Sequence, residues 1–288
     1  MFKKLSILLE MIKFKHTVFA LPFALMGAFL AGGGTPDLIV FVWVVVAMAG
    51  ARTAAMGFNR IVDVKFDKEN PRTAERALAA GTVSMMEAWL MVFIASGLFF
   101  VACYNLNKLT LLLSPFALSL TFFYSLTKRF TWLCHVVLGI ALAFSPLGGY
   151  VAVKGSLSGF PYVLSIGVFL WVSGFDMVYA CLDADFDRQR GLYSMPAYFG
   201  REKAFRLAGI FHGLAFCMFT LTGIWAGLNY FYYIGLAITA LCLVYQHIVV
   251  SPSDLSRIQL SFFNMNGFVS VVMFVSTWAS LLTATPSG

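Results

Sequence analysis

Residues 38–76 read LIVFVWVVVAMAGARTAAMGFNRIVDVKFDKENPRTAER, an apolar run that passes directly into a segment dense in charge. The apolar part has the length of about 20 residues that a helix needs to cross a lipid bilayer. In the charged part Asn59, Asp63 and Asp67 recur every four residues, so on a helix that continues out of the membrane they share one face. The stretch therefore predicts a row of oxygen ligands at a membrane surface, on a helix that Pro71 is expected to end.

Apolar runs of the same kind fill the rest of the chain. Of 288 residues, 60% are hydrophobic and only 11% are charged, whereas soluble domains are about 45–50% apolar and about 25% charged. This composition argues against a soluble enzyme, a disordered chain and a nucleic-acid-binding protein. Nine runs are long enough to span a bilayer, at 17–34, 38–58, 83–104, 109–126, 132–153, 160–182, 204–226, 229–250 and 262–283. We expect an all-α, polytopic membrane protein with about nine transmembrane helices, folded as a single domain over residues 1–288.

Residues 1–16 place four lysines around a set of apolar side chains. A signal peptide would end in a small-residue cleavage site, and none follows the first apolar run. We therefore expect a basic amphipathic N-terminal helix that lies on the membrane surface.

Basic residues outnumber acidic ones, 20 to 13, and the excess is not evenly spread. If the N-terminus is cytoplasmic, 16 of the 20 fall in inner segments, and only Lys108 and Lys154 fall in outer ones. Because lysine and arginine concentrate in cytoplasmic loops, this predicts an integral protein of a bacterial cell membrane with its N-terminus inside. The two long charged loops, 59–82 and 183–203, would then both face the cytoplasm.

The second charged loop follows the stretch 176–191, which reads DMVYACLDADFDRQRG. Asp176 lies inside an apolar run, and an acid placed there is costly in lipid and typical of a functional site. Asp183 and Asp187 repeat the spacing of four residues. On one continuous helix Asp176 would lie two turns earlier on nearly the same face, and Asp185 on the opposite side.

Two aspartate clusters at one membrane face, interleaved with lysine and arginine, indicate a shared polyanion. Carboxylates suit Mg²⁺, which is commonly completed by substrate phosphates, and two such ions can clamp a diphosphate as it leaves. Basic side chains can hold the remaining phosphate oxygens. No GxxxxGK[ST] nucleotide motif occurs, which favours a lipid diphosphate.

These motifs resemble those of the UbiA-type intramembrane aromatic prenyltransferases, over essentially the whole chain. The resemblance rests on the NxxxDxxxD run and on the DxxYAxxDxDxD stretch, with Arg72-Thr73, Arg76, Tyr124, Lys128-Arg129 and Leu138-Gly139 between them. It implies a helical bundle around a central cavity that opens sideways to the lipid. It also implies transfer of a polyprenyl group from a polyprenyl diphosphate to a small aromatic acceptor, with Mg²⁺ as cofactor.

The resemblance also implies roles for single residues. The ligands of metal and diphosphate would be Asn59, Asp63, Asp67, Asp183 and Asp187, and the four aspartates would be catalytic. Asp176 would add to the second set of ligands or orient one of them, and Tyr179 would contact substrate. The diphosphate would be contacted by Lys65, Tyr124 and Lys128, whereas Arg72 and Arg76 would serve it or an acceptor carboxylate.

Two departures from the family pattern leave the acceptor open. Asn59-Arg60 stands where Asn-Asp is usual, and Gly191-Leu192-Tyr193-Ser194-Met195 stands where many relatives have G-x-K-S-T. Both resemble a divergent 4-hydroxybenzoate-prenyltransferase-like branch. The acceptor is therefore an aromatic acid such as 4-hydroxybenzoate in ubiquinone or menaquinone synthesis, or a dihydroxynaphthoate of the futalosine route. A haem, a tocopherol precursor or a chlorophyllide is a third possibility.

A cation or metabolite transporter is the alternative from another class. Transporter sites lie near the bilayer midplane on interrupted helices, whereas these carboxylates gather at the inner ends of the expected spans. Outside the two motifs, His135 and His212 are expected to be satisfied core histidines, and the five cysteines to be core or lipid-facing residues.

Overall fold

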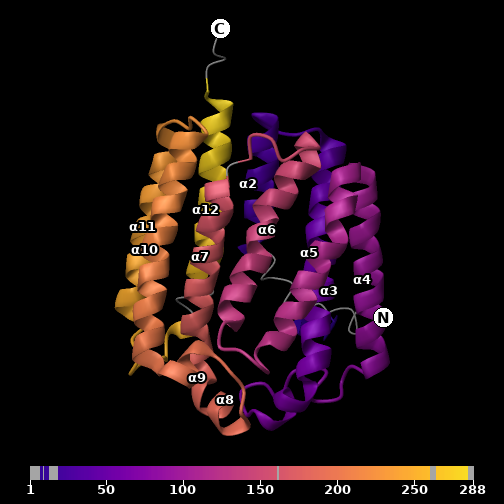
Figure 1. Cartoon of the computed structure of the whole chain (residues 1–288), viewed down its shortest axis with the longest axis vertical. Coiled ribbons are helices and arrows are strands. Elements are labelled where there is room, and N and C mark those ends of the chain that lie inside the picture. The colour runs from indigo at the N-terminus through magenta and orange to yellow at the C-terminus, as the bar shows by residue number, and fades with distance from the viewer. Residues whose placement is uncertain (1–6, 9, 13–18, 161, 260–263, 285–288) are drawn as a thin grey trace.

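The computed structural model of the chain describes residues 7–8, 10–12, 19–160, 162–259 and 264–284. Throughout this part the regular structure is helical, and the long helices stand side by side in one bundle (Figure 1). They are α2 (Leu21–Gly32), α3 (Leu38–Glu69), α4 (Met85–Leu106), α5 (Lys108–Thr127), α6 (Cys134–Lys154), α7 (Tyr162–Tyr179), α10 (Arg201–Trp225), α11 (Tyr230–Val249) and α12 (Met265–Leu282). Three short helices, η2 (Ala180–Leu182), α8 (Ala184–Arg190) and α9 (Met195–Phe199), lie at one end of the bundle.

Eight of these helices are long and apolar enough to cross a membrane, and they confirm a polytopic all-α protein. The expected first span, 17–34, corresponds to α2, an apolar helix of 12 residues. Residues 17 and 18 of that span are not described, and the surface helix expected at 1–16 also falls largely outside the described residues.

Helix α3 confirms the continuous helix expected from the first motif. It runs for 32 residues to Glu69, and Asn70 is its C-cap. At a rise of 1.5 Å per residue it is about 48 Å long, against a hydrocarbon core of about 30 Å. Its last turns therefore carry Asn59, Asp63 and Asp67 beyond the apolar part of the bundle.

The second motif is not one helix, and this expectation was wrong. Helix α7 ends at Tyr179, the chain continues as the 3₁₀ turn η2, and Asp183 has φ −106° and ψ 2° before α8 begins. The change of helix type rotates and displaces the chain beyond Tyr179. Asp176 therefore does not share a helix face with Asp183 and Asp187.

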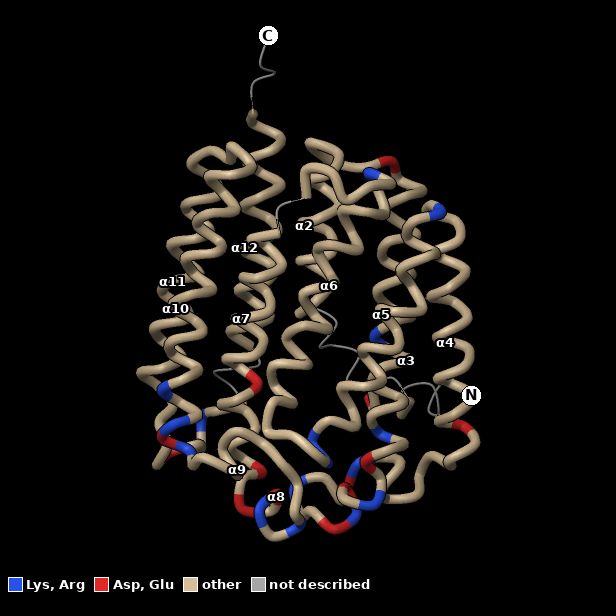
Figure 2. Tube along the Cα trace, in the orientation of Figure 1, with Lys and Arg blue, Asp and Glu red and all other residues tan. Residues whose placement is uncertain are grey.

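Charged residues gather at the end of the bundle that carries α8 and α9, and few lie at the other end (Figure 2). The C-terminal end of α3, the loop 70–84 and the segment 183–203 all meet there. The two motifs, more than 100 residues apart in sequence, thus share one end of the bundle.

The middle of the bundle depends on close contact between α2 and α6. A Cβ atom added to Gly149 would lie 1.8 Å from the carbonyl oxygen of Ala24, and one added to Gly27 would lie 2.0 Å from that of Pro146. These distances leave no room for a side chain. Small residues of this kind let membrane helices bring their backbones together.

We expect Gly149→Ala to destabilise the protein, because the added methyl must push α2 and α6 apart. Overpacking typically costs about 1–3 kcal/mol, which would appear as a lower midpoint of thermal unfolding in detergent. Gly97→Ala on α4 is the matched control, since a Cβ there has no neighbour within 4 Å. An equal midpoint for both variants would contradict the close contact.

Candidate functional site

A cavity of about 1140 Å³ runs along the inside of the bundle. Its walls come mainly from α3, α5 and α6. At the charged end both aspartate motifs line it, and further along the wall becomes mostly apolar, with Ala47, Ala51, Leu113, Ala117, Leu142 and Leu147. Towards the opposite end it reaches Leu106, Thr110 and Val151. The cavity therefore joins a polar mouth to a long apolar interior.

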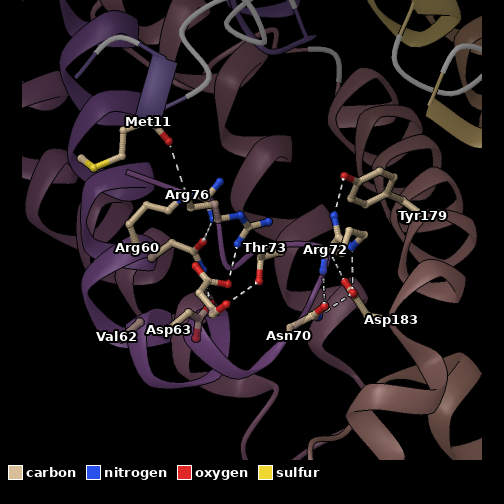
Figure 3. A network of polar contacts seen from close by, with 12 residues as sticks. Met11, Arg60, Val62, Asp63, Asn70, Arg72, Thr73, Arg76, Tyr179 and Asp183 are labelled. Carbon is tan, nitrogen blue, oxygen red and sulfur yellow. Dashed lines mark hydrogen bonds and ion pairs between the residues drawn. The ribbon is translucent and has the colours of Figure 1, made fainter. Parts of the chain in front are cut away.

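The first aspartate cluster lies on α3 and is held by basic residues from elsewhere in the chain. Asp63 accepts from the side-chain amide of Asn59 (2.9 Å) and pairs with Arg129, just beyond α5 (2.9 Å). Asp67 pairs with Arg76 of the following loop (2.7 Å), and part of this arrangement is drawn in Figure 3. These partners show that the aspartates are not paired with neighbouring lysines of their own helix.

The second cluster is tied to the loop that follows α3. The guanidinium of Arg72 bonds Asp183 through Nε (2.8 Å) and Nη2, and it also donates to the hydroxyl of Tyr179 (3.3 Å). The amide of Asn70 donates to the same carboxylate (2.9 Å), as Figure 3 shows. Two segments distant in sequence are thus joined at one carboxylate.

Asp187 is the most deeply buried acid of the second cluster, with a side chain 1% exposed. Lys128 pairs with it (2.8 Å), and the hydroxyl of Ser194 donates to it (3.0 Å). Burial raises the pKa of Asp187 above its ordinary value, and Lys128 offsets this only in part. Burial acts on Asp183 in the same direction, but the hydrogen bonds and charge of Arg72 outweigh it and lower the pKa of that carboxyl.

Most of the side chains expected at the site line this one cavity. They are Asn59, Asp63, Asp67, Arg72, Arg76, Tyr124, Lys128, Asp176, Tyr179, Asp183 and Asp187. Lys65 does not: it is exposed, and it follows Asp63 by two residues, which turns it to the other side of α3. Asp185 is also exposed and pairs with Arg188 and Arg201, as its place opposite the other aspartates predicts.

Asp176 is held differently from the other aspartates. Its Oδ2 lies 2.6 Å from Nδ1 of the buried His135 on α6. His135 in turn accepts from the backbone N–H of Met195 through Nε2 (3.2 Å). The satisfied core histidine expected at this position is confirmed, and it is also part of the cavity wall.

Two arginines of α3 also line the cavity, Arg60 within the first motif and Arg52 on its membrane side. Arg60, which replaces the usual aspartate, is buried and donates to the side-chain oxygen of Asn59 (3.2 Å) and to the carbonyl of Met11 (3.3 Å). Arg52 lies two helical turns before Asn59. Its buried Nε has no hydrogen-bond partner among the described residues, and none of their carboxylates pairs with it.

Arg52 was not among the residues expected at the site. The signal was present in the sequence, because an arginine inside an apolar run is as costly in lipid as Asp176 is.

The donor set fits Mg²⁺ that is completed by a substrate. Carboxylate oxygens from both clusters face the mouth of one cavity. No three His, Cys, Asp or Glu side chains within the described ranges form a ready-made metal cluster. Mg²⁺ is typically bound through one or two protein carboxylates, with phosphates and water as its other ligands, and this arrangement suits such a site.

Comparisons with known proteins agree with this geometry. The profile of the UbiA prenyltransferase family matches residues 20–278. A 4-hydroxybenzoate octaprenyltransferase of Citrobacter koseri is 31% identical over 251 residues, which cover 87% of this chain and 86% of that protein. A 4-hydroxybenzoate octaprenyltransferase of Francisella tularensis subsp. mediasiatica is 29% identical over 247 residues, 85% of this chain and 86% of that protein.

Solved structures show the same fold. The apo structure of a UbiA homologue from Aeropyrum pernix K1 is 36% identical in sequence and has a TM-score of 0.84, covering 91% of this chain and 96% of that one. A UbiA homologue from Archaeoglobus fulgidus bound to GPP and Mg²⁺ is 18% identical, with a TM-score of 0.71, covering 96% of this chain and all of that one.

We expect Lys128→Ala to destabilise the protein strongly, because it leaves Asp187 buried without a cation. Breaking a buried pair in this way costs about 3–5 kcal/mol; the lower end applies here, because Lys128 itself is 34% exposed. Arg188→Ala breaks the exposed pair with Asp185 and a hydrogen bond to the carbonyl of Ala197 (3.2 Å), and should cost about 1 kcal/mol. Thermal unfolding of both variants in detergent measures the difference, and equal midpoints would contradict it.

Proposed function

The chain belongs to the UbiA prenyltransferase family and is a multi-pass membrane prenyltransferase; we propose that it transfers a polyprenyl group from a polyprenyl diphosphate to an aromatic acid, with Mg²⁺. The observation that carries the proposal is the cavity: two aspartate clusters, bracketed by basic side chains, stand at the polar mouth of an otherwise mostly apolar channel. A diphosphate suits the mouth, and an isoprenoid chain suits the interior.

In this proposal the carboxylates bind the metal and the basic residues bind the diphosphate. Asp63 and Asp67, with Asn59, would hold metal from one side of the mouth, and Asp183 and Asp187 from the other. Bound Mg²⁺ supplies neutralisation of the charge that grows on the departing diphosphate. The Archaeoglobus fulgidus homologue, which shares the fold, binds GPP and Mg²⁺, and this supports the assignment.

The basic residues are already in place around the metal ligands. Arg72, Arg76, Lys128 and Arg129 each pair with one of the four carboxylates. When metal takes over those carboxylates, these side chains can turn to the phosphate oxygens, where arginine binds in a bidentate way. The same residues would thus stabilise the mouth of the cavity by ion pairs before substrate binds, and would bind the diphosphate afterwards.

The acceptor is proposed to be an acid because Arg52 lines the cavity at a deeper level and pairs with no carboxylate of the residues that the structure describes. It lies seven residues before Asn59, on the same face of α3, which is about 10 Å along the axis. This spacing leaves room for the allylic end of the donor and for an aromatic ring between the metal ligands and Arg52. A ring carboxylate would bind Arg52, and the relatives named as 4-hydroxybenzoate octaprenyltransferases favour 4-hydroxybenzoate.

The electron-rich ring is expected to attack the allylic carbon as its bond to the diphosphate breaks. In 4-hydroxybenzoate the position opposite the hydroxyl carries the carboxylate, so the new bond forms beside the hydroxyl. The product would be a prenylated acid on the way to a quinone. A dihydroxynaphthoate meets the same requirement for a carboxylate and is the second candidate acceptor.

We further infer that the charged end of the bundle faces the cytoplasm. Lysine and arginine gather there (Figure 2), and these residues mark the cytoplasmic side of membrane proteins. A water-soluble acceptor would then enter from the cytoplasm, while the donor chain stays within the bilayer.

We expect the purified protein to prenylate 4-hydroxybenzoate when it is given farnesyl diphosphate and Mg²⁺, with the product measured by mass spectrometry. Chelation of the metal, Asp63→Ala and Asp183→Ala should each abolish transfer while the protein still inserts into the membrane. Asp185→Ala is the matched control and should keep wild-type activity, because its side chain is exposed. If only a dihydroxynaphthoate is prenylated, the second candidate acceptor is correct. Prenyl transfer by Asp63→Ala at the wild-type rate would refute the mechanism.

We expect Arg52→Gln to raise KM for 4-hydroxybenzoate and leave KM for farnesyl diphosphate unchanged. A hydrogen bond to a charged group contributes about 1.5–3 kcal/mol, which corresponds to roughly a 10- to 200-fold loss in kcat/KM for the acceptor. Arg206→Gln, at an exposed arginine of α10 outside the cavity wall, is the control. An unchanged KM for the acid in Arg52→Gln would show that its carboxylate binds elsewhere.

A further inference from the structure

We propose that Asp176 is the base that takes the proton released from the acceptor ring, and that His135 is the positioning residue that holds it for this task. The inference rests on the proposed transfer to an aromatic ring and adds the fate of the proton. It follows from the partners, the depth and the hydrogen bonds of these two side chains.

Asp176 differs from the other four cavity aspartates in the charge of its partner. Each of those four pairs with a lysine or an arginine. Within the part of the chain that the structure describes, no lysine or arginine pairs with Asp176, and its one bonded neighbour is His135. A site for metal and diphosphate needs cations close by, so Asp176 stands apart from that machinery.

The hydrogen bonds of His135 fix which nitrogen carries its proton. Nε2 lies 3.2 Å from the backbone N–H of Met195 and must accept from it. A neutral imidazole then has its proton on Nδ1, which donates to Oδ2 of Asp176 across 2.6 Å. His135 therefore presents a fixed donor to one oxygen of Asp176, and Oδ1 is the oxygen left for the cavity.

Asp176 also lies at the right depth for the ring. It precedes Tyr179 by three residues on α7, which places it about 4.5 Å further into the bundle. Tyr179 is at the level of the second cluster, because its hydroxyl accepts from the arginine that binds Asp183. Asp176 thus lies on the membrane side of the metal ligands, in the layer between them and Arg52.

The chemistry of transfer requires a base in this layer. As the allylic C–O bond breaks, its electron pair leaves with the diphosphate, and a pair from the ring forms the new C–C bond. The ring carbon then holds both the prenyl group and a hydrogen. Loss of that hydrogen as a proton to a carboxylate oxygen of Asp176 returns the C–H electron pair to the ring and restores aromaticity.

The decisive test uses Asp176→Asn, 4-hydroxybenzoate deuterated on its ring, farnesyl diphosphate and Mg²⁺. We expect kcat to fall by about 10²- to 10⁴-fold, the usual contribution of a general base, with binding of farnesyl diphosphate unchanged. Removal of the ring proton should become the slow step, so the ratio of kcat for the protiated over the deuterated acceptor should exceed that of the wild type.

Three results overturn the inference. Wild-type kcat in Asp176→Asn would show that another group takes the proton. Loss of Mg²⁺-dependent binding of farnesyl diphosphate in that variant would place Asp176 with the metal ligands and leave the proposed function standing. No transfer by the wild-type protein would overturn the proposed function itself, and this inference with it.

A series at position 135 tests the positioning role. His135→Phe keeps the ring but removes the donor, and should lower kcat by at least 10-fold with little change in KM for either substrate. His135→Asn restores an N–H near Nδ1 and should recover part of kcat. His212→Asn replaces another buried membrane histidine, outside the cavity wall, and is the control. Equal kcat in His135→Phe and His135→Asn would refute the positioning role.

Discussion

A buried carboxylate must be matched by a positive charge or by hydrogen bonds, and this requirement organises the charged end of the bundle. An ion that leaves water without a partner costs several kcal/mol. The chain meets the cost by bringing basic residues from separate segments to each acid. The loop after α3 supplies Arg72 to Asp183 and Arg76 to Asp67, and the end of α5 supplies Arg129 and Lys128 to both clusters. These pairs join α3, α5, the loop and the segment after α7 around the mouth of one cavity.

This arrangement gives the cavity one charged end and one apolar end. All the acids of the two motifs are at one end, so the helices beyond that end are free to be apolar and to pack through small residues such as Gly27 and Gly149. A ligand with a charged head and a long apolar tail matches the resulting gradient. In the proposed reaction the same gradient would separate two kinds of chemistry, with anion binding at the mouth and ring chemistry one or two helical turns deeper.

The face that residues share on one helix could be predicted from their spacing in the sequence, whereas contacts between different helices and loops could not. Asn59, Asp63 and Asp67 were placed correctly because α3 continues without interruption, and spacing alone then fixes the shared face. Asp176 was placed on the wrong face because no proline or glycine marks the break after Tyr179. Lys65 was expected at the site from the family resemblance alone. It follows Asp63 by two residues, and this spacing points its side chain away from the cavity.

The roles proposed for Arg52 and His135 could not be predicted from the sequence for a different reason. Their meaning depends on what faces them across the cavity, and the sequence does not give those neighbours. An intramembrane arginine is nevertheless a visible signal, and it would have found Arg52. His135 had no such signal, because its role depends on the backbone N–H of Met195 and on the carboxylate of Asp176, which come from other helices.

Four carboxylates at the mouth of the cavity are neutralised by four basic side chains before any ligand arrives. A prenyl diphosphate carries several negative charges, and these four pairs have no net positive charge with which to receive them. In the proposed reaction most of the countercharge of the diphosphate would therefore arrive with it and depart with it. Each cycle of such an enzyme would exchange divalent cations with the surrounding solution together with the diphosphate. The concentration of free divalent cations would then control substrate entry as directly as the concentration of the substrate.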